Sequence, residues 1–245
     1  MIALVTGASS GIGEATARRL AREPDAKLVL VARREERLQE LAEELGGATI
    51  VAADLVDPAA AGRIRETVEQ EHGRLDLLVN NAGTAWRASF DEGGYDNVRR
   101  TMELNFDAVV RLTEALLPLL RRSAPSAIVN VSSVAARVAR ASSGAYGASK
   151  AALAAWTDAL RLEEASHGVH VGLVLPGFVA TEGFPQTQLV ERRLTRWMVS
   201  RPERVAEAIV DAGLRGKPER YVPRPYALAA AARVLVPRLV GRATG

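Results

Sequence analysis

The chain of 245 residues contains no cysteine, which excludes disulfide bonds, thiolate metal sites and a cysteine nucleophile. That absence also suits a reducing compartment. Histidine is scarce: the three that occur have no partners at metal-ligand spacing, so we predict no metal site. No apolar run reaches the roughly 18 residues of a membrane-spanning helix. The N-terminus also lacks the pattern of a secretory signal. We therefore expect a cytoplasmic protein.

Charge of one sign is not concentrated in blocks. The 32 basic residues, of which three are lysines, face 29 acidic ones, and aromatic residues make up 4% of the chain. No basic block is interleaved with aromatics, so we predict no nucleic-acid partner. Apolar residues, at 48%, suffice for a substantial core.

Repeats, linkers and low-complexity tracts are also absent, so we predict one α/β domain over residues 1–225. A basic, apolar tail over 226–245 follows. We expect it to be helical and to pack on the domain or at a subunit interface. Contact with an anionic membrane surface is the less favoured alternative, because Pro237 interrupts the apolar run.

A glycine-rich turn stands near the start of the chain. The apolar run 2–6 leads into Gly7-Ala-Ser-Ser-Gly11-Ile-Gly13, and a helical pattern then runs up to Pro24. A strand, a glycine turn and a helix form the context of a phosphate-binding turn, since glycines let a pyrophosphate approach the backbone and the helix N-terminus offers free N–H groups. The alternative is a tight turn whose glycines serve packing alone.

Two arginines follow the second apolar run, residues 27–32. In this architecture the end of the second strand meets the adenosine ribose, where an acid would bind a free 2′-hydroxyl and an arginine would bind a 2′-phosphate. Arg33 and Arg34 stand there, and no acid occurs before Glu35. The guanidinium fork suits phosphate, so the pattern favours NADP(H) over NAD(H). The alternative is that both arginines merely open a solvated helix.

Further apolar runs alternate with helical patterns. We predict strands at 2–6, 27–32, 48–53, 75–79, 127–133 and 169–177 with a short seventh at 219–223, and helices at 35–45, 58–72, 95–121 and 146–166. Pro118 should kink or end the helix that contains it. The long insertion after Gly177 is typical of a lid or binding loop. Such alternation predicts a parallel sheet covered by helices on both faces.

Polar residues stand where three of these strands end. The glycine turn follows the first strand, Asn81 the fourth and Ser133 the fifth. Ligands in open α/β sheets bind at the carboxyl ends of strands, so we expect these residues to lie on one rim. Ser132 should point to the opposite face of its strand.

A tyrosine and a lysine stand four residues apart on a predicted helix, and thirteen residues separate Ser133 from the tyrosine. Tyr146 and Lys150 would share one helix face, and the ammonium would favour ionisation of the phenol. Such a tyrosine is a plausible proton donor. An isolated Tyr-x-x-x-Lys is more often an exposed pair, but convergence with the strand-end residues favours a catalytic role.

Taken together, the motifs resemble the short-chain dehydrogenase/reductase family over nearly the whole chain. The residues that carry the resemblance are Thr6-Gly7-Ala8-Ser9-Ser10-Gly11-Ile12-Gly13, Asp54, Asn80-Asn81-Ala82-Gly83, Asn105, Ser133, Tyr146-x-x-x-Lys150, and Pro176-Gly177 with Thr181. The resemblance implies a Rossmann-type doubly wound sheet of seven strands in the order 3-2-1-4-5-6-7. It also implies that Tyr146 is the acid/base of hydride transfer between the nicotinamide and a carbonyl or secondary alcohol.

The same resemblance implies roles for the neighbours of Tyr146. Lys150 would lower the pKa of Tyr146 and hold the nicotinamide ribose, Ser133 would bind the substrate oxygen, and Asn105 would position a water that connects Lys150 to solvent. The implied cofactor-binding residues are Gly7, Ser9, Ser10, Gly11, Ile12, Gly13, Arg33, Arg34, Asp54, Leu55, Asn81, Ala82, Gly83, Tyr146, Lys150, Pro176, Gly177 and Thr181.

The glycine turn departs from the family pattern in one respect. NADP-dependent members of the family often carry a basic residue in this turn, whereas this chain has Ser9 and Ser10. We predict an NADP(H)-dependent carbonyl reductase or alcohol dehydrogenase that forms a homodimer or homotetramer. Phe178, Phe184, Trp197 and Trp86 suggest a hydrophobic small-molecule substrate. The loops that would choose it, 84–95 and 182–200, carry no motif. Two alternatives remain open: a nucleotide-sensing protein without catalysis, and a membrane- or partner-docked reductase of lipid or acyl substrates.

Overall fold

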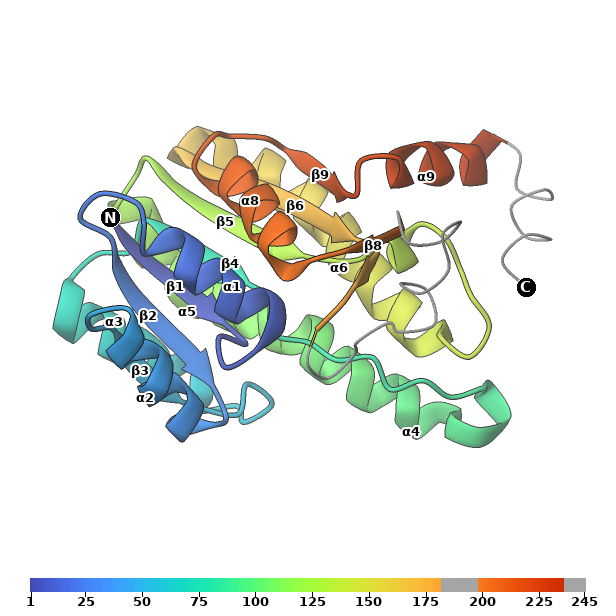
Figure 1. The fold of residues 1–245 in the computed structure, drawn as a ribbon, viewed down its shortest axis with the longest axis horizontal. Helices are drawn as coiled ribbons and strands as arrows, with labels where there is room; N and C mark the ends of the chain where they lie inside the picture. The colour runs from blue at the N-terminus through green and yellow to red at the C-terminus, as the bar shows by residue number, and fades with distance from the viewer. Residues whose placement is uncertain (182–197, 236–245) are drawn as a thin grey trace.

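The computed structural model describes residues 1–181 and 198–235. Phe184, Trp197 and the end of the tail therefore lie outside the described residues. At the centre of the described part is a seven-stranded parallel sheet (Figure 1). In chain order its strands are β1 (Ile2–Thr6), β2 (Lys27–Ala32), β3 (Thr49–Ala52), β4 (Leu77–Asn80), β5 (Ser126–Val131), β6 (Val169–Pro176) and β9 (Glu219–Val222).

The strand order across this sheet is β3-β2-β1-β4-β5-β6-β9, and all neighbouring pairs are parallel. The predicted doubly wound order is therefore confirmed, with β9 as the seventh strand. The helices are α1 (Gly11–Leu20), α2 (Glu35–Glu44), α3 (Ala60–His72), α4 (Phe90–Met102), α5 (Ala108–Arg122), α6 (Gly144–Glu164), α8 (Pro202–Gly213) and α9 (Tyr226–Leu235). Two short 3₁₀ turns, η2 (Val134–Ala136) and η3 (Ala165–His167), flank α6.

Helices cover both faces of the sheet, which explains why its strands read as continuous apolar runs. Side chains alternate along a strand, so Ala3 and Val5 enter the cluster under α1, α2 and α8, whereas Ile2 and Leu4 enter the cluster under α3, α5 and α6. Figure 1 shows α1 and α8 on one side of the sheet and α5 on the other. The core is thus two apolar layers that share one sheet.

The long helical stretch predicted at 95–121 differs from the structure at its start. Helix α4 already begins at Phe90, because Ser89 and Glu92 form a capping box in which each accepts a hydrogen bond from the other's backbone N–H. This Ser-x-x-Glu signature is visible in the sequence. Gly94, with φ +50°, then bends the first turns of the helix.

The same stretch contains a π-helical turn in its middle and a proline near its end. Between α4 and α5 lies one π-helical turn, η1 (Glu103–Asp107), which contains Asn105. Pro118 was predicted to kink or end its helix, and it does not end it, because α5 continues to Arg122. Pro118 is exposed, as is Glu114, whose carbonyl loses its helical N–H partner, so water can satisfy that carbonyl.

The insertion after Gly177 contains a small second sheet that the sequence did not predict. Strand β7 (Phe178–Val179) pairs in parallel with β8 (Val199–Ser200), so the two ends of the insertion lie side by side. Elsewhere the predicted helix boundaries were off by about two residues, which is the ordinary scatter of helix ends. The division of the chain at residue 225 stays a prediction, although α9 does supply a helix within the predicted tail.

Residues that follow four of the strands meet at one edge of the sheet. Gly7 follows β1, Arg33 follows β2, Asn81 follows β4 and Ser132 follows β5. The chain winds outward from β1 to β3 and then returns to continue from β4 in the other direction. A crevice opens at such a switch point, beyond the carboxyl ends of the strands.

An ion pair between an exposed arginine and a buried glutamate joins the ends of α5 and α6 and generates a stability prediction. Glu164, 2% exposed, accepts hydrogen bonds from Arg121 Nε at 2.8 Å and Nη2 at 2.5 Å. Glu164→Gln should lower the free energy of unfolding by about 1–3 kcal/mol, because charge-assisted hydrogen bonds are lost. Urea denaturation measures this. The adjacent exposed residue supplies the control, Glu163→Gln, which should leave stability unchanged; equal effects of the two substitutions would contradict the prediction.

Candidate active site

A single cavity of about 1530 Å³ occupies the crevice at the carboxyl edge of the sheet. Pockets for one drug-sized ligand span roughly 300–1,000 Å³, so this one can hold a dinucleotide beside a second small molecule. The predicted site residues that line it are Gly7, Ser9, Ser10, Gly11, Ile12, Arg33, Arg34, Asp54, Leu55, Asn81, Ala82, Gly83, Ser133, Tyr146, Lys150, Pro176, Gly177 and Thr181. The two remaining ones, Gly13 and Asn105, lie behind this lining.

The glycine turn needs glycine for two distinct reasons. Gly7 and Gly11 have φ values of +66° and +59°, in the left-handed region that side chains disfavour. Gly13 instead lies against the backbone of Gly7: a methyl group on its α-carbon would stand 2.1 Å from the Gly7 carbonyl oxygen. The first turn of α1 is thereby brought onto the end of β1.

Thr6 and Asn81 connect this turn to the end of β4. The Thr6 hydroxyl oxygen accepts hydrogen bonds from the backbone N–H groups of Asn81 at 2.9 Å and Ala82 at 3.0 Å. The Asn81 side-chain amide donates in return to the Thr6 carbonyl at 2.9 Å. These contacts align the Gly7 turn with the Asn81 turn across the switch point. Thr6 appeared in the motif that carries the resemblance, but no role was predicted for it.

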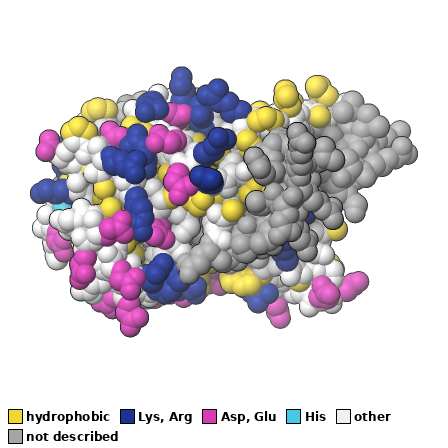
Figure 2. Space-filling model, viewed as in Figure 1, with side chains coloured by type: hydrophobic (Ala, Val, Ile, Leu, Met, Phe, Trp, Pro, Cys, Tyr) yellow, Lys and Arg dark blue, Asp and Glu magenta, His cyan; other side chains and the backbone are white. Residues whose placement is uncertain are grey.

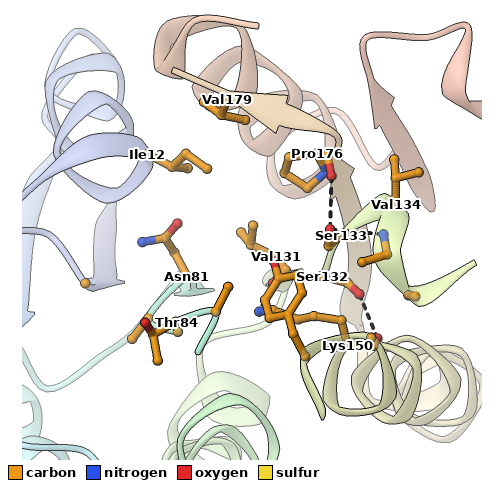
Figure 3. Close-up of a pocket in the computed structure, with 18 of the residues that line it drawn as sticks. Ile12, Asn81, Thr84, Val131, Ser132, Ser133, Val134, Lys150, Pro176 and Val179 are labelled. Atoms are coloured by element: carbon orange, nitrogen blue, oxygen red, sulfur yellow. Dashed lines mark hydrogen bonds between the residues drawn. The ribbon is translucent and has the colours of Figure 1, made fainter. Parts of the chain in front are cut away.

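Ser132 and Ser133 diverge at the end of β5. Ser132 Oγ donates to the Lys150 carbonyl at 2.7 Å and so fastens β5 to helix α6. Ser133 Oγ donates to the Pro176 carbonyl at 3.3 Å and accepts from the Ala135 N–H at 3.1 Å. Figure 3 shows Ser133 and Pro176 joined in this way, with Asn81 and Ile12 on the other side of the cavity. Ser133 also lies close enough to the Tyr146 phenol to lower its pKa.

Lys150 is buried at the floor of the cavity. Its Nζ donates to the Val131 carbonyl at 2.9 Å, and it lies close to Gly83, where a methyl group would stand 3.3 Å from Nζ and 2.9 Å from Asn105 Oδ1. Gly83 therefore leaves room for two polar side chains to approach each other. Figure 3 shows Lys150 on α6, with Val131 and Ser132 beside it.

Asn105 uses its whole amide group on protein partners. Oδ1 accepts from the Thr84 N–H at 2.9 Å, and Nδ2 donates to the Thr84 carbonyl at 2.9 Å and to Ser149 Oγ at 3.0 Å. Ser149 Oγ in turn donates to the Tyr146 carbonyl at 2.9 Å. The π-helical turn thus holds both the loop after β4 and the first turn of α6. The predicted water relay through Asn105 stays a prediction.

Burial governs the electrostatics of the Tyr146–Lys150 pair. Desolvation raises the pKa of the Tyr146 phenol, and the hydrogen bond with Ser133 and the charge of Arg87 oppose this rise in pKa only partly. Desolvation also lowers the pKa of Lys150 to about 8. The sequence predicted that Lys150 lowers the pKa of Tyr146. That role of Lys150 stays a prediction. In the structure the charge of Arg87 also lowers the pKa of Tyr146, and sequence reasoning missed Arg87 because its loop carries no motif.

The two arginines after β2 have different partners. Arg34 Nη2 donates to the Ser9 carbonyl at 3.1 Å and to Ser9 Oγ at 3.2 Å, so it ties the glycine turn to β2. The Arg33 side chain is 75% exposed, and its Nη1 stands 4.0 Å from Asp54 Oδ2. Arg33 is therefore the more available of the two for an additional ligand.

The other end of the cavity is built partly by residues that sequence reasoning did not single out. The Tyr226 ring of α9 covers Gly177 so closely that a methyl group there would stand 2.1 Å from Cε2. Tyr226 Oη donates to the Met198 carbonyl at 3.2 Å, and Arg140 stacks on the predicted lining residue Phe178 at 4.9 Å. Tyr226 comes 80 residues after Tyr146 in the chain, and no spacing rule connects them.

Trp86, the other described aromatic predicted to line the cavity, does so with Arg100 stacked on its ring at 4.9 Å. Within residues 1–181 and 198–235, no group of three or more histidine and carboxylate side chains could hold a metal ion. Within the same ranges, each helix is too short or too polar to cross a membrane.

The model of the short chain dehydrogenase family matches residues 1–190, and the chain belongs to that family. It is 35% identical over 241 residues to the rhamnolipids biosynthesis 3-oxoacyl-[acyl-carrier-protein] reductase of Pseudomonas aeruginosa, covering 94% of this chain and 90% of that protein. It is also 35% identical over 190 residues to dehydrogenase/reductase SDR family member 7B of Bos taurus, covering 74% of this chain. That match spans 58% of the bovine protein, which is less than two thirds of its length.

Two solved structures share the fold with a TM-score of 0.80 each, and each match covers 90% of this chain and 93% of the other. One is Pseudomonas aeruginosa RhlG in an active-site complex with NADP, at 33% sequence identity. The other is L-sorbose reductase from Gluconobacter frateurii complexed with NADPH and L-sorbose, at 29% identity. The architecture is thus that of a short-chain dehydrogenase.

The lowered pKa of Lys150 predicts a pH dependence of stability. The folded cofactor-free protein should release this proton at about pH 8 rather than 10.5, so between these values the unfolded chain binds more protons. As pH rises through this window, wild type should gain up to about 3 kcal/mol of unfolding free energy relative to Lys150→Met. Urea denaturation at several pH values measures the difference. The exposed-lysine control, Lys27→Met, should show no such trend, and a pH-independent difference for Lys150→Met would contradict the prediction.

Proposed function

We propose that this protein is an NADP(H)-dependent oxidoreductase that transfers a hydride between the nicotinamide and a carbonyl or secondary alcohol. The observation that carries the proposal is the convergence of Ser133, Tyr146 and Lys150 in the same cavity as the glycine turn. A proton donor beside a dinucleotide-sized cavity suits this reaction class.

The residues of the turn fit a pyrophosphate. Gly7 and Gly11 carry no side chain where the backbone borders the cavity, and Ser10, the N-cap of α1, makes no side-chain capping hydrogen bond. The first N–H groups of α1 therefore remain free to bind an anion, with the helix dipole in support. Thr181 stands across the turn, since a methyl group on Gly11 would meet its Cγ2 at 3.1 Å. Thr181 would hold the nicotinamide end or the adjoining phosphate from that side.

At the adenosine end, the exposed Arg33 would bind a 2′-phosphate, and Asp54 would contact adenine. Arg34 would support the site indirectly, through its hydrogen bonds to Ser9. The similar structures determined with NADP and NADPH support NADP(H) as the cofactor, with NAD(H) the less favoured alternative.

The raised pKa of Tyr146 keeps its phenol protonated at neutral pH, which suits it to donate a proton to a carbonyl oxygen. Bound NADPH would supply the hydride that completes the reduction. Ser133 Oγ would exchange its bond to the Pro176 carbonyl for one to the same substrate oxygen and so orient it. Lys150, largely an ammonium below pH 8, would stabilise the phenolate that Tyr146 becomes. In the reverse reaction Tyr146 Oη would accept the alcohol proton.

Two relatives support reduction of a carbonyl, because their names describe a 3-oxoacyl reductase and a sorbose reductase. Val134 and Phe178 line the cavity beside Ser133 and Pro176, which supports an apolar body next to the reacting carbon. A purely nucleotide-sensing protein would bind NADPH without consuming it. Assays of ketones with NADPH, followed by the absorbance of the reduced nicotinamide, distinguish the two.

Replacement of the proposed acid tests the mechanism. Tyr146→Phe removes only the hydroxyl group, so turnover should fall by about 10²- to 10⁴-fold. NADPH binding, measured by fluorescence titration, should stay near its wild-type value. The matched control is Tyr95→Phe. Although residue 95 ends a stretch predicted to choose the substrate, the structure places it on α4, 69% exposed and outside the cavity lining, so this variant should keep full activity. If Tyr146→Phe retained turnover, Tyr146 would not be the acid.

A second test concerns the 2′-phosphate. Arg33→Asp should weaken NADPH binding by about 10- to 100-fold relative to NADH, because one charged contact is lost and a repulsive one gained. The ratio of kcat/KM with the two cofactors measures the change. Arg22→Asp, at an exposed position outside the cavity lining, controls for the change in net charge and should leave the ratio unaltered.

A further inference from the structure

The charges around the substrate end of the cavity are of one sign. Four arginines line it there, from three separate segments of the chain: Arg87, Arg137, Arg140 and Arg233. Among all lining residues in the described ranges, Asp54 is the sole carboxylate, and it stands at the opposite, adenosine end. A cleft lined by charges of one sign attracts ions of the opposite sign.

Arg140 is held in place by an aromatic ring rather than by an acid. Its guanidinium carbon stands 4.9 Å from the centroid of the Phe178 ring, and the residue is exposed. Its charge also reaches the phenol of Tyr226 and opposes the rise in the pKa of that group. Stacking fixes the plane of the guanidinium and leaves its N–H groups available for a further partner.

Arg233 approaches the cavity from α9. Tyr226, Ala229 and Arg233 are spaced by three and four residues, so they share the helix face that lines the cavity. Tyr226 anchors this face through its contact with Gly177 and its hydrogen bond to the Met198 carbonyl. Because Tyr226 fixes α9, the Arg233 side chain is held at the opening of the substrate end of the cavity.

Many arginines of the described residues pair with acids, whereas no ion pair is formed by Arg140 or Arg233 there. Arg137, on the same loop as Arg140, stands 3.8 Å from Asp158 and 3.6 Å from Glu219. Figure 2 shows basic and acidic side chains interspersed over the part of the molecule that carries α1 and α2. Within residues 1–181 and 198–235, no carboxylate forms an ion pair with Arg140 or Arg233.

We propose that Arg140 and Arg233 bind an anionic oxygen group of the substrate, a carboxylate or a phosphate, at the end remote from its carbonyl. The substrate would then be an oxo acid or oxo phosphate with an apolar middle part, which would lie along Val134, Val138 and Phe178 between Ser133 and the two arginines. This inference rests on the proposed carbonyl reduction. Planar guanidinium groups pair with both anions through parallel hydrogen bonds.

Pairs of substrates that differ only in charge test the inference. The first pair is an oxo acid and its methyl ester, and the second is an oxo phosphate and the corresponding uncharged alcohol, all assayed with NADPH. Wild type should prefer the anionic member of at least one pair by about tenfold or more in kcat/KM, as expected for charge-assisted hydrogen bonds. The pair that shows the preference identifies the anion. This preference should decline as the salt concentration rises, because exposed charges are screened.

Substitutions then assign the effect to the two arginines. Arg140→Gln and Arg233→Gln should each reduce the ratio of kcat/KM for the anionic and neutral members, and the double variant should bring it close to one. Arg22→Gln, which removes an exposed arginine outside the lining, should keep the wild-type ratio. The inference would be overturned if wild type reduced the neutral substrates as well as the anionic ones. It would also be overturned if the double variant kept the wild-type ratio of kcat/KM for anionic and neutral substrates. In both cases the proposed reductase function would stand. Absence of turnover with every carbonyl tested would overturn both.

Discussion

A methyl group on the α-carbon of Gly13 would stand 2.1 Å from the Gly7 carbonyl oxygen, which shows how tightly α1 is pressed onto the end of β1. The Asn81 amide donates to the neighbouring Thr6 carbonyl from the end of β4. Two strands and one helix are therefore locked together at the switch point of the sheet. The other strands are attached to this unit by parallel ladders, so the positions of Ser133 and Arg33 on the rim follow from it.

Burial then sets the chemistry that the rim can perform. Desolvation favours the neutral forms of both groups, so it raises the pKa of Tyr146 and lowers the pKa of Lys150 to about 8. The phenol thus holds its proton until a substrate oxygen approaches, while Lys150 keeps most of its charge below pH 8. Hydrogen bonds through Asn105 and Ser149 fix the turn of α6 that carries the phenol. The positions of Tyr146 and Lys150 and their protonation states thus depend on the same buried packing.

Much of the fold and of the candidate site was predictable from local patterns. Apolar runs, glycine turns and the preference for right-handed crossovers predicted a parallel sheet covered on both faces, whereas its strand order was implied by the resemblance to the short-chain dehydrogenase/reductase family. The strand-end residues favoured a site shared by Ser133 and Tyr146. Whether the helix would end at Pro118 could not be decided from the sequence, because that depends on whether the freed carbonyl faces water. The role of Tyr226 was not predictable either, because its contact with Gly177 joins segments that no spacing rule relates.

By itself, the sequence determined the succession of strands and helices and the polar residues at the strand ends, since both follow from periodicity and turn chemistry over a few residues. Only the tertiary structure decided which of the adjacent arginines, Arg33 and Arg34, is hydrogen bonded within the protein and which is exposed for a ligand. Arg34 reaches back to Ser9, 25 residues earlier, whereas Arg33 remains 75% exposed. It also brought Arg87, from a loop without a motif, close enough for its charge to counter the rise in the pKa of Tyr146. Side-chain direction and charge balance are properties of neighbours distant in sequence, and they exist only once the chain has folded.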